Sequence, residues 1–184
     1  LKWYADAYSE ADVYAYYPYN ANGTPAAYAA VLDQTAGIAQ ADFMAAAKKG
    51  VLPTPNAITM VFKHLMTKIV VNIDNQSGAD VTAVKILGGD AACEIDLPNL
   101  AVLPASGAMS TELTEITAYE ATAGKVWKAI VIPQTAKLSV EVSLSNGKKI
   151  TQPLAEMTLK SGGQYTINAR LLQDNMIVSA SGEI

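Results

Sequence analysis

The 184-residue sequence contains one cysteine, Cys93, and one histidine, His64. A single cysteine excludes an intramolecular disulfide, and the two residues together are too few for a Cys/His zinc framework. Basic residues are also scarce, because 13 Lys and Arg stand against 17 Asp and Glu. Nucleic-acid binding depends on Lys and Arg contacts to phosphates, so this composition argues against a nucleic-acid partner. No run of about 18 apolar residues occurs, so the sequence predicts no transmembrane helix.

The first residues lack an initiator methionine and lack the basic and apolar regions of a secretory signal. We therefore expect a processed chain rather than a precursor with its signal attached.

Candidate catalytic and metal-binding groups are few. His64 would need an orienting carboxylate and a nucleophile close by to act as a base, and no Gly-x-Ser-x-Gly motif is present. We expect His64 to be a packed or hydrogen-bonded histidine at a strand end, and Cys93 to be a small core residue. Asp74, Asn75 and Asp80 do not have EF-hand spacing, so they predict a turn closed by Asx hydrogen bonds. The sequence therefore predicts no enzyme, no cofactor and no metal site.

Residues 1–56 are rich in alanine and tyrosine. The segment around Val13–Tyr17 predicts a short strand buried on both faces and ended by Pro18. The alanine-rich segments 25–34 and 42–50 are expected to form short helices, and the two prolines of 51–56 predict a linker.

After residue 57 the apolar residues alternate with a period of two, which is typical of strands. Asn146-Gly147 predicts a type I′ hairpin turn. No convincing helix separates these strands, so the pattern favours an all-β, antiparallel two-sheet sandwich. The expected strands are 58–62, 68–74, 81–87 (ended by Gly88-Gly89-Asp90), 93–97, 111–121, 125–133, 137–144, the segment after Gly147, 164–172 and 176–180.

Tyrosines gather near the start of the chain, where they offer flat apolar faces with a polar rim. Two interpretations remain open for them. Either they form an exposed surface that contacts sugars or a partner protein, or they fill the seam of a small or incomplete domain. The candidate surface residues are Tyr14, Tyr16, Tyr17 and Tyr19.

Six motifs in order give the sequence a resemblance to a known family. They are ADVYAYYPYN (11–20), DFMAA (42–46), VFKHLMTKIVVNI (61–73), ITAYEA (116–121), WKAIVIPQT (127–135) and GGQYTINARLL (162–172). The set resembles the fimbrillins, the Mfa-like subunits of type V pili on the surface of anaerobic Gram-negative bacteria.

The resemblance implies two transthyretin-like β-sandwich domains in series. Residues 1–56 would be the C-terminal part of a first domain that is incomplete at its N-terminus, and 57–184 the second domain. It also implies export as a lipoprotein through the outer membrane, proteolytic maturation, and assembly with other fimbrial subunits by strand exchange.

Two functions follow as hypotheses. The first is a structural or adhesive subunit of a cell-surface fimbrium, whose partners are other subunits and a host or bacterial surface ligand. The alternative is a glycan- or protein-binding surface module that uses the tyrosines.

Overall fold

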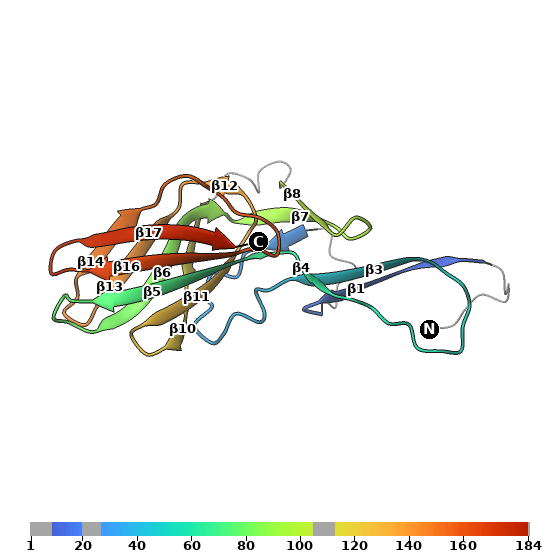
Figure 1. Cartoon of the computed structure of the whole chain (residues 1–184), viewed down its shortest axis with the longest axis horizontal. Helices are drawn as coiled ribbons and strands as arrows, with labels where there is room; N and C mark the ends of the chain where they lie inside the picture. The colour runs from blue at the N-terminus through green and yellow to red at the C-terminus, as the bar shows by residue number, and fades with distance from the viewer. Residues whose placement is uncertain (1–8, 20–26, 105–112, 184) are drawn as a thin grey trace.

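The computed structural model describes residues 9–19, 27–104 and 113–183. Within these ranges the fold is all-β, and no helix occurs, so none is available to cross a membrane. Two large sheets face each other as a sandwich, and a narrow extension projects from one end (Figure 1).

The first large sheet has five strands in the order β10-β11-β5-β16-β17. Its strands are β5 (Thr67–Asn75), β10 (Tyr119–Thr122), β11 (Val126–Val131), β16 (Gln164–Leu171) and β17 (Met176–Glu183). The pair β5–β16 is parallel over its whole length, whereas the other pairs in the sheet are antiparallel. One parallel pair thus lies inside the predicted antiparallel sandwich.

The second large sheet has four antiparallel strands in the order β14-β13-β6-β9. Its strands are β6 (Val81–Asp90), β9 (Leu113–Thr117), β13 (Ser139–Leu144) and β14 (Lys149–Pro153). The β13–β14 pair is the predicted Asn146-Gly147 hairpin, and Gly147 has a φ of 84°. The sandwich prediction is confirmed in its class.

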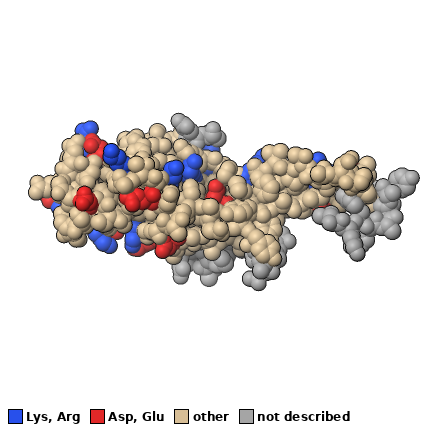
Figure 2. All heavy atoms as spheres, turned by 90° about the horizontal axis from the view of Figure 1, so that it is seen from below, with Lys and Arg blue, Asp and Glu red and all other residues tan. Residues whose placement is uncertain are grey.

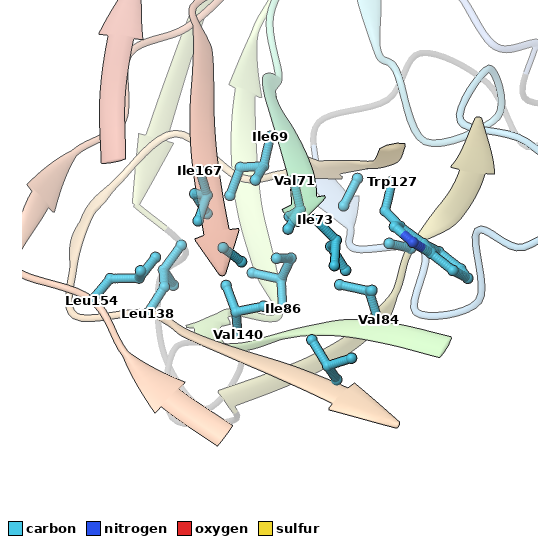
Figure 3. Close-up of a cluster of buried hydrophobic side chains, with 14 of the residues drawn as sticks. Ile69, Val71, Ile73, Val84, Ile86, Trp127, Leu138, Val140, Leu154 and Ile167 are labelled. Atoms are coloured by element: carbon cyan, nitrogen blue, oxygen red, sulfur yellow. The ribbon is translucent and has the colours of Figure 1, made fainter. Parts of the chain in front are cut away.

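The alternating side chains of the two sheets form the main core (Figure 3). Ile69 and Val71 of β5 and Ile167 of β16 meet Ile86 of β6 and Val140 of β13, and each is at most 1% exposed. Burying such a side chain stabilises the folded state by roughly 1.5–3 kcal/mol. Apolar residues therefore recur at every second position of these strands, and this alternation is the pattern that predicted them.

Three smaller sheets complete the described structure, with orders β1-β3-β4, β2-β7-β8 and β12-β15. Their strands are β1 (Ala11–Tyr17), β2 (Ala27–Ala29), β3 (Met44–Val51), β4 (Lys63–His64), β7 (Ala92–Asp96), β8 (Ala101–Pro104), β12 (Thr135–Ala136) and β15 (Met157–Thr158). We call residues 9–19 and 44–62 the arm; the arm holds β1, β3 and the return segment 52–62.

The two predicted helices are wrong. Within 25–34 the described residues form β2 and an irregular segment, and 42–50 leads into β3. Ala45 and Ala46 of β3 are fully buried. Their backbones pair with Tyr16 and Ala15 of β1. Cross-strand pairing and burial outweigh the helical preference of alanine at these positions.

Three strand predictions also need correction. Segment 58–62 forms no strand, because it belongs to the exposed return segment of the arm, where nothing pairs with it among the described residues. β6 does not end at Gly88 but continues to Asp90 through a bulge, with Gly88 at a φ of 90°. Within 111–121, the described part is two strands, because β9 and β10 belong to different sheets and the buried Ala118 lies between them.

A second hydrophobic cluster lies where the arm meets the sandwich. Tyr28, Phe43 and Leu65 pack there with Ile130, near the end of β11, and Ile132, just beyond it. The cluster therefore joins residues from both sides of position 56, and the division into two domains at that position stays a prediction.

Candidate interaction surface

β1 contains Tyr14, Tyr16 and Tyr17, and Tyr19 follows shortly after it. Among the described residues, β3 is the only sheet neighbour of β1. Alanines lie opposite two of the tyrosines, because Tyr14 pairs with Ala47 and Tyr16 with Ala45. The small side chains on β3 leave the ring of Tyr14 exposed, whereas Tyr16 is partly buried.

The structure separates Tyr16 from the other three tyrosines. Its ring stacks on Phe43, with centroids 6.1 Å apart and an interplanar angle of 7°, and it packs against the second cluster. Phe43 also meets the edge of Tyr28, whose hydroxyl donates to the carbonyl of Ala41 at 2.7 Å. Burial raises the pKa of Tyr28 above its usual value, so this phenol stays protonated as a structural donor.

Tyr14, Tyr17 and Tyr19 are exposed, with Tyr19 showing 84% of its surface. The prediction of a strand at this position is confirmed, but burial of both its faces is wrong, because the described arm has no second layer of strands. Tyr16 therefore fills a seam and the other three lie on the surface, and their contact with sugars or a partner protein stays a prediction.

Exposed apolar side chains concentrate on the arm. Besides the three tyrosines, its return segment exposes Leu52, Val61 and Phe62, with Val61 at 76%. Charged side chains gather on the sandwich, whereas the visible face of the arm is mostly uncharged (Figure 2). A concentration of exposed apolar side chains on one part of a molecule is typical of protein–protein contact.

A second open surface is the edge strand β17. Leu172 N–H donates to the carbonyl of Asn175 across the turn that precedes β17. Hydrogen-bonded and non-hydrogen-bonded residue pairs alternate along an antiparallel ladder. Counting from this bonded pair, Val178 and Ala180 are in non-hydrogen-bonded pairs, so their backbone groups point away from β16, toward the edge. A groove of about 620 Å³ lies beside this edge, between β17 and the segment 152–157 of the other sheet.

The groove is mainly apolar, and its floor includes Leu154, Met157, Met176 and Val178. An edge with unpaired backbone groups beside an apolar groove can accept another extended segment. Nothing in the sequence pattern singled out β17, because a period of two is the same for an edge strand and a central strand.

His64 lies at the end of β4, exposed, with its Nδ1 2.8 Å from Oδ2 of Asp42. The prediction of a hydrogen-bonded strand-end histidine is confirmed. The two side chains border a hollow of about 240 Å³, and no serine, threonine or cysteine lines it among the described residues. The pair therefore connects β4 with the chain leading into β3.

Cys93 and the Asx turn also match their predictions. Cys93 is 1% exposed, and burial, aided by Asp90, raises the pKa of its thiol to about 12. The thiol is therefore protonated at neutral pH and serves packing. Asn75 closes the predicted turn, since its Oδ1 accepts from the backbone N–H and the hydroxyl of Ser77.

The fold and these surfaces define a class: a two-layer β-sandwich protein with an apolar arm and an open sheet edge. No curated protein matches the sequence. The family described as "Fimbrillin-like" matches residues 1–184, and the chain belongs to this family.

Solved structures share the fold. A candidate cell adhesion protein from Bacteroides uniformis superposes with a TM-score of 0.71 at 20% identity, covering 94% of this chain and 72% of that one. A similar protein from Bacteroides ovatus gives a TM-score of 0.71 at 24% identity, covering 94% and 67%. The tip fimbrial protein Mfa3 from Porphyromonas gingivalis, with a C-terminal truncation, gives 0.52 at 10% identity, covering 79% and 65%.

Proposed function

We propose that the chain is a structural and adhesive subunit of a cell-surface fimbrium that joins other subunits by adding or exchanging β-strands. The observation that carries the proposal is the pair of unlike, unfinished surfaces on one molecule: the apolar arm and the β17 edge. Membership of the fimbrillin-like family supports it. The proposed function involves no catalysis and no cofactor.

Two unlike surfaces on one subunit favour a head-to-tail contact. If the arm of one copy meets the β17 edge of the next, the pair still has a free arm at one end and a free β17 edge at the other. Such heterologous contacts build open chains rather than closed dimers. Extended backbone from the arm would satisfy the edge groups of Val178 and Ala180, while apolar side chains fill the groove.

The exposed tyrosines fit the same role. Tyrosine is enriched at protein interfaces because its ring is apolar and its hydroxyl is polar. We therefore assign Tyr14, Tyr17 and Tyr19 to subunit or surface contacts and Tyr16 to the seam. A purely glycan-binding use of the tyrosines is the second candidate, favoured by the exposure of Tyr19. Export through the outer membrane as a lipoprotein precursor belongs to the same proposal.

A mixing experiment tests the head-to-tail contact. Ala180→Pro removes an edge donor without breaking the β16 ladder, because the N–H of residue 180 points away from β16. Tyr19→Lys with Val61→Lys places charge on the arm at exposed positions. We expect the parent chain to elongate, each variant alone to stay monomeric, and a mixture of the two to form only one-to-one dimers, measured by sedimentation velocity and electron microscopy.

Leu103→Lys is the matched control, since Leu103 is an exposed apolar residue outside the arm, and this variant should elongate like the parent. A parent chain that stays monomeric at high concentration contradicts the proposal. Dimerisation of the arm variant by itself would mean that the contact joins identical surfaces, which also contradicts it.

A further inference from the structure

The outer face of the five-stranded sheet, which faces away from the core, contains a hollow of about 420 Å³. The strand register aligns side chains from three neighbouring strands across it. Asn72, Asn168 and Ser179 form one row, and the next row holds Asp74, Arg170 and Ile177. None of these residues belongs to the arm, but Ile177 and Ser179 also line the groove beside the β17 edge.

The polar groups of the hollow are partly paired with one another. Asn72 Nδ2 donates to Asn168 Oδ1 at 3.0 Å, and Arg170 Nε donates to Asp74 Oδ2 at 3.0 Å. Each carboxamide keeps a second polar group, an acceptor on Asn72 and a donor on Asn168. The guanidinium keeps its terminal N–H groups, and Ser179 adds a hydroxyl.

The charge and spacing of these groups limit the ligand. The charges of Asp74 and Arg170 cancel, so the hollow offers no net charge to an anion or a cation. Side chains of adjacent strands lie about 4.8 Å apart, and successive rows lie about 6.6 Å apart along a strand. A neutral ligand that bonds to several of these groups at once therefore needs several hydroxyl or amide groups separated by distances of this order. Ile177, 58% exposed, provides an apolar surface at the border.

We propose that this hollow binds a neutral saccharide. Its hydroxyls would bond to the free groups of Asn72, Asn168 and Arg170, and its C–H face would lie on Ile177. Cross-strand polar pairs also stabilise a sheet, but by only about 0.2–1 kcal/mol each. That role uses one bond of each pair and leaves the remaining groups of Asn72, Asn168 and Arg170 available to a ligand. The proposal concerns adhesion and does not rest on the subunit contact proposed above, although Ile177 and Ser179 border both sites.

Binding is tested with the full-length Tyr19→Lys, Val61→Lys variant as the parent, because it is expected to stay monomeric. It is labelled with ¹⁵N and titrated with methyl glycosides of mannose, galactose, glucose and N-acetylglucosamine, and with sialyllactose as an acidic probe. We expect at least one neutral glycoside to shift the amide resonances of residues 72–74, 168–170 and 177–179. Asn168→Ala should weaken this binding about tenfold or more, as expected when a hydrogen-bonding group is lost.

Thr151→Ala is the matched control, since Thr151 is an exposed strand residue of the other sheet, and binding should be unchanged in it. Asn168→Asp introduces a charge without changing the size of the side chain, and it should also weaken ligand binding. Because this variant keeps the packing of the parent, its loss of binding reflects the changed chemistry rather than misfolding. The proposal is overturned if no neutral probe binds at millimolar concentration, if only sialyllactose binds, or if Asn168→Ala binds as the parent does.

Discussion

Three buried polar side chains show how single residues stabilise this fold: Gln34, Thr67 and Thr114. Gln34 acts as a substitute for a strand. Its Nε2 donates to the carbonyl of Ile130 and its Oε1 accepts from the N–H of Ile130, both at 2.8 Å. One carboxamide thus completes the hydrogen bonds of β11 on the side where β10 no longer pairs with it. It also ties the chain between the two parts of the arm to the sandwich.

The two buried threonines should respond oppositely to the same substitution. Thr67 Oγ1 donates to the carbonyl of Lys160 at 2.8 Å, whereas Thr114 Oγ1 has no hydrogen-bond partner among the described residues. Thr114→Val removes an unsatisfied hydroxyl without changing the shape, so we expect stability to rise by about 1 kcal/mol. Thr67→Val removes this hydrogen bond, while the Lys160 carbonyl keeps the bond from the N–H of Gly163, so stability should fall by about 0.5–1.5 kcal/mol.

Chemical denaturation of both variants measures these differences, and each threonine serves as the control for the other. Equal changes of the same sign would contradict the assignment of the two hydroxyls.

Among the elements, the parallel pair β5–β16 depends on the turn that leads into β16. Gly162 N–H donates to the carbonyl of Met66 and Lys68 N–H to the carbonyl of Gly163, which aligns the first residues of the two strands. Gly162 has a φ of 71°, and a Cβ at this position would lie 3.0 Å from the carbonyl oxygen of His64. Glycine is needed here for both conformation and space.

Gly162→Ala and Gly124→Ala separate these two requirements. Gly124 has a φ of 61°, but a Cβ there meets nothing within 4 Å. We expect Gly124→Ala to cost about 1–2 kcal/mol from conformation alone. Gly162→Ala should cost more, because the His64 backbone must also move. Thermal unfolding compares the two variants, and an equal loss would show that the contact with His64 contributes nothing.

At the scale of the whole molecule, stability is distributed unevenly. The sandwich has a closed core between two sheets, whereas the arm has one sheet with exposed apolar side chains. A two-stranded ribbon without a second layer is marginally stable in water. The arm therefore gains more than the sandwich from a contact with another subunit.

Hydrogen exchange measures this difference. In the monomeric Ala180→Pro variant we expect amides of β1 and of residues 47–51 to exchange at least tenfold faster than those of β5 and β16, because local opening exposes few buried contacts there. In assembled parent protein the arm amides should become protected. Arm amides as protected in the monomer as those of β5 would contradict the proposed role of the arm.

The sequence by itself determined the class of fold and most strands of the sandwich. The alternating residues of β13, for example, determine which of its faces is buried, because the period of two is a local property. The Asn146-Gly147 turn, the Asx turn at Asn75 and the buried Cys93 were predictable for the same reason. The six motifs also predicted the family.

Only the tertiary structure decided which strands are neighbours and which edges stay open. Ala45 and Ala46 prefer a helix locally, yet pairing with β1 makes them strand residues. The parallel partner of β5 lies 96 residues away in the chain, as the register of Val71 with Ile167 shows. Gln34, the β17 edge and the row of Asn72, Asn168 and Ser179 exist only because distant segments meet, and no local pattern encodes such meetings.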